Sequence, residues 1–212
     1  MNIDVASLSP DRMYKLLVNT VMPRPIALVS TVDEEGRANA APFSFFNVFS
    51  NAPPLLILGV EGNRRDPARP HKDTARNIIS KGEFVVNLVS RAITEQMVVC
   101  AIDFPEGVSE FDAAGFTARP SKVVAVPGIS ESPVAFECRL FDVRALPHNR
   151  SLITGEIVGM YVRDDLIDEK MHVDVAGLDL VGRMHGTGWY TTTRDRFQVD
   201  RMTVADWQAM KT

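Results

Sequence analysis

Several signatures that would assign a function directly are missing from this sequence of 212 residues. The chain has no GxSxG, HExxH or Walker A motif and no GxGxxG after a strand, which argues against the enzyme classes that these motifs mark. A lone GxG, Gly186-Thr187-Gly188, is weak evidence for any function. The two cysteines, Cys100 and Cys138, lie too far apart for CxxC or metal spacing. We therefore expect free, buried thiols in a reducing compartment.

Charge and hydropathy give no indication of a nucleic-acid or membrane partner. The net charge is −4, and the Lys and Arg residues are scattered along the chain. No apolar run approaches the length that crosses a membrane. The start of the chain leads into no apolar segment typical of a secretion signal. We expect a cytoplasmic protein that binds neither nucleic acid nor membrane.

The acidic run at residues 164–169, followed by His172 and Asp174, is the best candidate for a metal site. Its spacing matches no known metal-binding loop, and a solvated acidic loop is the commoner explanation. We therefore expect no metal.

The pattern of apolar residues predicts a mainly β protein with peripheral helices. A helix should begin at Ser9 and end before Pro23. Single strands are predicted at residues 26–32, 37–41, 55–60 and 83–89. A long hairpin should pair 135–146 with 151–162, and a last strand is predicted at 188–193. Further helices should cover 73–81, which Gly82 ends, 91–100, which Ser90 caps, and 203–211. A short helix at 110–114 should interrupt an otherwise irregular segment. Because strands and helices do not alternate regularly, an antiparallel barrel is favoured over a doubly wound sheet, as one domain with a core at about 10–198.

The stretch from Ala40 to Pro54 is the most unusual part of the chain. It holds four phenylalanines within seven positions, mixed with Ser and Asn and closed by proline at both ends. Neither an ordinary strand nor an ordinary loop has this composition. It suits a planar heteroaromatic ligand with polar edges, and a buried core segment is an equally good explanation.

A second informative stretch is Lys72-Asp73-Thr74, at the start of a predicted helix. A cation, a hydroxyl and unpaired backbone N–H groups at a helix N-terminus favour a phosphate. The simpler alternative is that Asp73 or Thr74 caps the helix. The preceding polar loop, residues 61–71, carries Arg64, Arg65 and Arg69. A ring-binding stretch followed by a phosphate-binding one indicates a mononucleotide cofactor.

The order of five motifs resembles the flavin reductase-like proteins, and within them the flavoredoxin branch. The motifs are PRPIALVST at 23–31, APFSFFN at 41–47, the proline pair at 53–54, KDT followed by NI at 72–78, and GEFVVN at 82–87. The resemblance covers about residues 10–198. It implies an FMN-binding split β-barrel, an antiparallel Greek-key barrel that is usually a homodimer with flavin near the subunit interface.

The resemblance also implies roles for individual residues. Ser30 and Thr31 would lie beside the ribityl chain and the ring edge of the flavin. The isoalloxazine and ribityl region would be lined, largely through backbone groups, by Pro42, Ser44, Phe45, Phe46 and Asn47. Phosphate contacts would come from Lys72, Asp73, Thr74 and Asn77. Arg24 would either support this site or brace the chain. Near the C-terminus, Arg183, His185 and Tyr190 would face NAD(P)H, although His185 fits a surface turn equally well.

Such a protein needs no catalytic acid or base of its own, because hydride passes from the nicotinamide to the flavin. The first hypothesis is an NAD(P)H:flavin oxidoreductase that serves a partner monooxygenase or another acceptor. The second is a non-enzymatic FMN electron carrier reduced by a protein donor. FMN is favoured over FAD because the phosphate motif would end the ligand.

Overall fold

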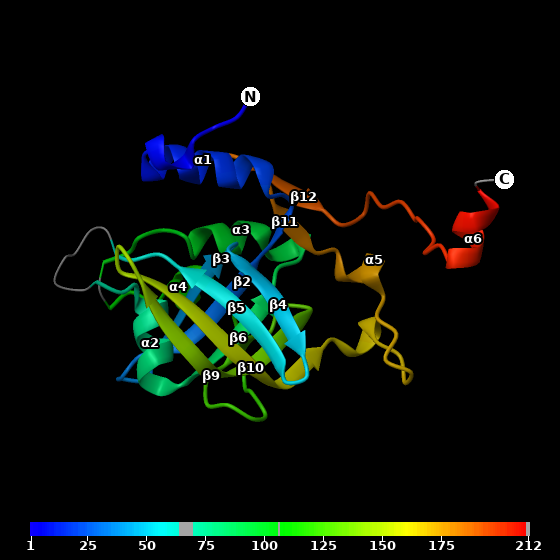
Figure 1. Cartoon of the computed structure of the whole chain (residues 1–212). Coiled ribbons are helices and arrows are strands. Elements are labelled where there is room, and N and C mark those ends of the chain that lie inside the picture. The colour runs from blue at the N-terminus through cyan, green and yellow to red at the C-terminus, as the bar shows by residue number, and fades with distance from the viewer. Residues whose placement is uncertain (64–69, 106, 211–212) are drawn as a thin grey trace.

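The computed structural model describes residues 1–63, 70–105 and 107–210, and a seven-stranded antiparallel sheet dominates it (Figure 1). In order across the sheet, the strands are β3 (Ala38–Phe43), β2 (Ala27–Val32), β6 (Glu83–Leu88), β9 (Val134–Leu146), β10 (Arg150–Val162), β5 (Pro54–Val60) and β4 (Phe46–Asn51). The predicted mainly β, antiparallel architecture is confirmed. The hairpin of β9 and β10 turns at His148 and Asn149, both with positive φ, as a tight turn requires.

The sheet must roll up, because its two edge strands are consecutive in the chain. In a flat sheet, β3 and β4 would lie six strand spacings apart, roughly 29 Å at about 4.8 Å each. Only Ser44 and Phe45 join them, and such a link spans roughly 10 Å. At this link the backbone N–H of Gly59 donates to the carbonyl of Phe45 at 2.8 Å. A Cβ on Gly59 would lie 3.2 Å from that of Phe45, so the close approach favours glycine.

The main hydrophobic core fills the inside of the rolled sheet. Alternate residues of its strands point inward, among them Val29, Leu56 and Phe84, each fully buried. Helix α2 (Asp73–Lys81) adds Ile78 to this core. Two short turns of helix, η3 (Asp164–Leu166) and α5 (Val175–Leu178), add Leu166 and Leu178.

A second core lies on the outer face of β2 and β3, where Leu28 and Ala40 are fully buried. Leu28 of β2 packs there with Met97 of α3 (Thr94–Val99) and Phe111 of α4 (Glu110–Ala113). Val181 joins it from a separate three-stranded ribbon, in the order β1 (Arg24–Pro25), β11 (Val181–Arg183), β12 (Tyr190–Thr192). The remaining short elements are η1 (Val5–Ser7), β7 (Ala118–Arg119) and β8 (Gly128–Ile129).

Most predicted helices are confirmed to within one or two residues. Ser9 caps α1 (Pro10–Thr20) through a bond from the N–H of Arg12, and Gly82 ends α2 with φ 71°. The helix predicted at 91–100 begins instead as a 3₁₀ turn, η2 (Arg91–Ile93), and the Ser90 side chain makes no capping bond. Helix α6 (Val204–Ala209) is capped by Thr203.

Two expectations need correction. The stretch at 40–54, for which no strand was predicted beyond Ala41, supplies the end of β3, all of β4 and the first residue of β5. Both edges of a sheet tolerate proline and exposed apolar residues. The short strands β1, β7, β8 and β11 were not predicted.

The loop arginines Arg64, Arg65 and Arg69 and the predicted helix end at Lys211 lie outside the described residues. In the described part of the chain, no helix is both long and apolar enough to span a membrane.

Candidate functional site

The candidate site, called the groove below, is the outer edge of β3 together with the two cavities near its ends. In the described part of the chain, β3 pairs only with β2. The hydroxyl of Ser109 donates to the carbonyl oxygen of Ala38 at 2.6 Å, so this carbonyl points away from β2. Backbone groups of alternate residues point to the same side of a strand, so those of Ala40 and Pro42 also face away from β2. Ala40 is fully buried, so the backbone group that this edge can offer a ligand is the carbonyl of Pro42.

At the Phe43 end, the edge strand borders a cavity of about 330 Å³. Three distant segments form its walls: the end of β3 and the residue after it, helix α3, and the β11–β12 ribbon with its loop. They contribute Pro42, Phe43 and Ser44, then Met97 and Val98, and then Arg183, Gly188 and Tyr190. The Phe-rich stretch and the C-terminal motif, predicted separately, thus meet in one mostly apolar cavity. Its walls suit a flat ring with a few polar groups.

At the other end of β3 the surroundings are charged. A small cavity of about 60 Å³ is lined by Asn39, Arg37 and the first turn of α2, which includes Asp73 and Arg76. From Asn39 to Ser44 the strand extends roughly 17 Å, at about 3.3 Å per residue. An apolar end and a charged end at this separation match a flavin ring and its phosphate.

The start of α2 rules out one of the two interpretations of Lys72-Asp73-Thr74. Lys72 is the N-cap residue and makes no side-chain capping bond, while Asp73 and Thr74 lie inside the first turn. Capping by Asp73 or Thr74 is therefore wrong. Asp73 pairs with Arg76 at 2.7 Å, and the Thr74 side chain is almost fully buried. The backbone N–H groups of this turn keep the positive end of the helix dipole available to an anion.

Asn39 carries a buried polar atom that indicates a ligand. Its Nδ2 donates to Glu110 at 2.6 Å, whereas its Oδ1 is buried without a hydrogen-bond partner among the described residues. Leaving a buried acceptor unsatisfied is costly. A hydroxyl of a sugar-like chain lying along β3 would satisfy it, so the groove fits the middle part of a flavin nucleotide.

Ser30 and Thr31, expected beside the flavin, are fully buried in β2 and engaged within the protein. The Ser30 hydroxyl donates to the carbonyl of Pro127 at 2.7 Å and accepts from Asn87 at 3.1 Å. The Thr31 hydroxyl, on the opposite face of the strand, accepts from Asn77 at 3.1 Å. Of these three predicted site residues, Asn77 lines the small cavity at the charged end of β3, whereas Ser30 and Thr31 are fully buried.

Arg24 braces three segments of the chain, which was one of its two expected roles. Its guanidinium donates to the carbonyls of Val18, Val21 and Met184 and to the hydroxyl of Ser44, at 2.7–3.3 Å. Burial lowers the pKa of this guanidinium, and nearby Arg183 lowers it further. Through Ser44, Arg24 holds the wall of the apolar cavity in place.

The other candidates of the Phe-rich stretch, Phe45, Phe46 and Asn47, do not line this cavity. Phe46 is buried in the main core. Phe45 is partly exposed and lies 6.3 Å from the ring of Tyr14. The Asn47 carboxamide is exposed and accepts from the N–H of Val48. These three residues shape the link between β3 and β4 and do not line the groove.

The candidate nicotinamide residues form one side of the cavity mouth. Arg183 and Tyr190 are paired across β11 and β12, and the guanidinium lies 4.8 Å from the ring centre. His185 lies in the connecting loop, stacked on Trp189 at 5.7 Å, and is not part of the cavity wall. Arg183 and Tyr190 can therefore face a ligand in the cavity, whereas His185 lies at its edge.

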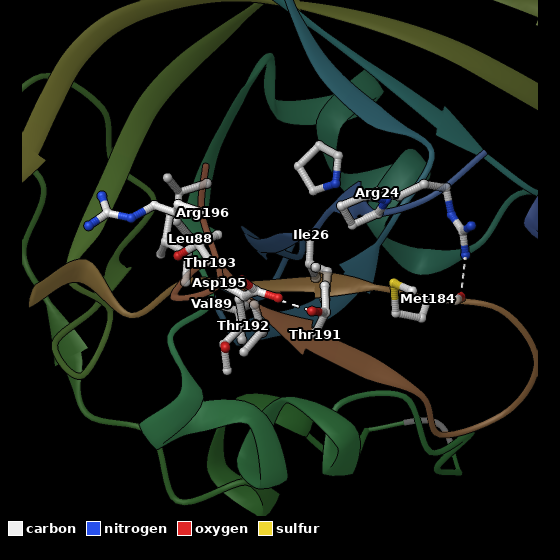
Figure 2. A pocket seen from close by; sticks show the side chains of 15 residues that line it. Arg24, Ile26, Leu88, Val89, Met184, Thr191, Thr192, Thr193, Asp195 and Arg196 are labelled. Carbon is white, nitrogen blue, oxygen red and sulfur yellow. Dashed lines mark hydrogen bonds between the residues drawn. The ribbon is translucent and has the colours of Figure 1, made fainter. Parts of the chain in front are cut away.

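A second, larger cavity of about 580 Å³ lies along the same ribbon (Figure 2). Its walls are mostly apolar and include Ile26, Leu88 and Val181. Arg24 contributes to it, and Figure 2 shows its bond to the carbonyl of Met184. Ile26 lines both cavities, so only a thin wall separates them.

Sequence reasoning missed several residues of the site. Met97 and Val98 were placed on a predicted helix, but nothing local shows which face of it meets the cavity. Asn39 and Glu110 were not singled out, because their contact joins segments 71 residues apart. Burial raises the pKa of the Glu110 carboxyl, and neighbouring acidic groups add to this effect.

The acidic run shows the geometry of a self-contained loop. Asp168 accepts hydrogen bonds from the backbone N–H groups of Lys170 and His172 and contacts the His172 ring at 3.1 Å. Within the described ranges, no group of three or more His, Cys, Asp or Glu side chains could hold a metal ion.

Comparison with known proteins agrees with the fold. The family model described as flavin reductase like domain matches residues 19–180. A protein of Deinococcus radiodurans, named only as uncharacterized, is 44% identical over 98% of this chain and 92% of its own length. The solved structure of Pseudomonas fluorescens 2-nitrobenzoate 2-nitroreductase NbaA is 40% identical, with a TM-score of 0.87 over 96% of this chain and 98% of that one.

Two further solved structures share the fold. Nitrilotriacetate monooxygenase component B from Bacillus cereus is 30% identical, with a TM-score of 0.87 over 94% of this chain and 98% of that one. Flavoredoxin of Desulfovibrio vulgaris (Miyazaki F) has a TM-score of 0.73 over 97% of this chain and all of that one. At 21% identity, the flavoredoxin similarity concerns the fold alone.

Proposed function

The chain belongs to the flavin reductase-like family, and we propose that it binds FMN along β3 and passes hydride to it from NAD(P)H. One observation carries this proposal: Pro42 to Ser44 share one cavity with Arg183 and Tyr190, at the apolar end of an edge strand whose other end is charged.

In this proposal, each segment that lines the groove holds one part of the cofactor. The isoalloxazine would lie against Phe43 and Met97, with its polar edge towards backbone groups of β3. The ribityl hydroxyls would pass Asn39, and the phosphate would meet Lys72 and the first N–H groups of α2. Because these charged groups end the groove, FMN fits better than FAD. Ser30, Thr31, Asn77 and Arg24 would act as positioning residues.

The nicotinamide would enter over the ring from the side of the β11–β12 ribbon. Arg183 offers positive charge to its phosphates, and Tyr190 offers an aromatic face. When bound, the flavin supplies the hydride acceptor. The chain's own task is to hold two flat rings in contact and to keep water out of an apolar cavity.

The test is an anaerobic titration of the purified protein, loaded with FMN, with NADH and NADPH in turn. Bleaching of the oxidised flavin spectrum within seconds supports a reductase and identifies the donor. A spectrum that bleaches only with dithionite would favour the electron-carrier alternative. If the protein is loaded with FMN and retains none of it after dialysis, the proposed site is contradicted.

Two acceptors deserve separate assays. The 40% identity with a 2-nitrobenzoate nitroreductase favours a nitroaromatic acid as direct acceptor. The 30% identity with component B of a monooxygenase favours release of reduced flavin to a partner enzyme. Nitro-group reduction by the protein alone, in the absence of added free flavin, would select the first. Activity that requires micromolar free flavin would select the second.

We also propose a cytoplasmic homodimer. Cys100 and Cys138 are free and buried, which suits a reducing compartment. Burial raises the pKa of the Cys100 thiol to about 12, and Glu110 contributes to this shift, so the thiol stays protonated and unreactive.

A further inference from the structure

The C-terminal segment, residues 194–210, projects away from the barrel as an extended arm that ends in α6 (Figure 1). Its apolar side chains face solvent: Phe197 is 91% exposed, Val199 78% and Val204 71%. No residue of α6 is buried. An exposed apolar segment of this kind marks an interaction surface.

The sequence of the arm nonetheless fixes where its helix, α6, begins. The hydroxyl of Thr203 accepts from the N–H of Asp206, and the Asp206 carboxylate accepts from the N–H of Thr203 at 2.8 Å, which completes a capping box. A helix of six residues is too short to be stable alone in water. Its start is therefore fixed, and its stability has to come from packing against another surface.

The large cavity of Figure 2 offers such a surface. Its volume of about 580 Å³ exceeds that of any single side chain, and Ile26, Val89 and Val181 form apolar walls. The apolar surface continues past the cavity edge, where Val21 and Met22 are 56% and 42% exposed. An aromatic side chain with an apolar segment behind it is the chemistry that this surface fits.

The base of the arm directs it away from its own cavity. The Arg194 guanidinium makes a two-point contact with Asp179, at 2.7 and 2.9 Å, which fixes where the arm leaves the body. Asp195 and Arg196 already form part of the cavity lining, and Phe197 follows directly with its side chain in solvent. To fill its own cavity, the chain would have to reverse at once.

A second copy removes this constraint, because every copy carries both an arm and a cavity. We propose that the arm of one copy docks on a second copy, with Phe197 in the cavity bounded by Ile26 and Val181, and that the exchange is reciprocal. Such a two-fold arrangement is self-complementary and closed. The docked arm would then lie against the thin wall that Ile26 forms beside the candidate flavin cavity. The proposal does not depend on the flavin function.

A photo-crosslinking residue at position 197 of the full-length protein tests this exchange. One copy carries p-benzoylphenylalanine in place of Phe197 and one affinity tag, and the unmodified copy carries another tag. We expect an adduct of doubled mass with both tags, mapping to residues 21–26 or 180–193. The matched control replaces Val175 on α5, which is 48% exposed, and should give no such adduct.

Crosslinks within one chain, adducts elsewhere on the partner, or no adduct at all would each overturn the exchange. An independent measurement uses Phe197→Asp, a substitution at an exposed position that should leave the far-UV spectrum unchanged. Sedimentation velocity over a dilution series should show the dimer dissociation constant raised at least about tenfold. An unchanged dissociation constant would contradict the proposal.

Discussion

The polar groups of the adjacent strands β2 and β3 differ in their hydrogen bonding. In β2, which has neighbours on both sides, Ser30 and Thr31 are fully buried and bonded to other parts of the protein. In β3, at the sheet edge, the Oδ1 of Asn39 has no hydrogen-bond partner among the described residues. The position of a strand in the sheet therefore decides whether its motif residues maintain the fold or contact a ligand.

Two groups of residues follow from this comparison. The internally bonded group comprises Arg24, Ser30, Thr31, Asn77 and Asn87. The groove group comprises Asn39, Pro42, Ser44, Lys72 and Tyr190. Substitutions in the first group should lower stability, and substitutions in the second should lower flavin affinity.

The largest effect is expected for Arg24→Met. The substitution leaves the carbonyls of Val18, Val21 and Met184 without their donor in a mostly buried position. We expect a loss of about 3–5 kcal/mol in the free energy of unfolding, measured by urea denaturation, because several buried acceptors lose a charged donor at once. Arg24→Lys, which can keep one of these bonds, should lose less. Equal losses for the two variants would contradict the bracing role.

The next effect is expected for Asn87→Leu. The Asn87 carboxamide donates to the carbonyl of Leu28 and to Ser30, and accepts from the N–H of Ile129 at 2.9 Å. Removing it should cost about 2–3 kcal/mol of stability. The FMN dissociation constant of the folded protein should stay within about twofold, as fluorescence titration can measure. The exposed Asn2→Leu variant is the control.

Lys72→Met should show the reverse pattern. Lys72 is exposed at the start of α2 and makes no capping bond, so stability should change little. Loss of one charge at a phosphate should raise the FMN dissociation constant about tenfold, or about 1.4 kcal/mol. Lys81→Met, at the other end of the same helix, is the matched control and should leave FMN binding unchanged. Equal effects of the two would place the phosphate elsewhere.

The smallest effect concerns pH and Glu110→Gln. Because burial raises the pKa of the Glu110 carboxyl in the folded protein, the folded state holds this proton more tightly than the unfolded one. The contribution of Glu110 to stability is therefore present below its unfolded pKa and is lost as pH rises through its folded pKa. In Glu110→Gln this component of the pH dependence should vanish, while the bond from Asn39 can remain. Urea midpoints from pH 4 to 7 measure it, with Glu95→Gln as control.

The sequence was most informative where a local signal dominates. Ser9 and Gly82 place helix ends because capping and a left-handed φ are properties of a few consecutive residues. The long hairpin was located by its alternation and its turn. These elements already imply an antiparallel barrel, so its class could be predicted without any tertiary contact.

The sequence was least informative where a role depends on distant partners. Strands β1 and β11 are two and three residues long and pair across more than 150 positions, so no local pattern marks them. Ser30 lies in a recognisable motif, but only the fold shows that Pro127 occupies its hydroxyl. The resemblance to a family indicated many of the groove residues. Their division into an internally bonded group and a groove group required the three-dimensional arrangement.

The two tryptophans of the chain have a practical consequence for such experiments. Trp189 lies beside His185 at the ribbon loop and is 62% exposed, and Trp207 lies on the arm and is 50% exposed. Neither indole is in a hydrophobic core, so intrinsic emission should shift only slightly when the barrel unfolds. The same emission should respond when a ligand covers the ribbon or a second subunit covers the arm. The protein thus carries natural optical reporters of its contacts, and its folding has to be followed by circular dichroism.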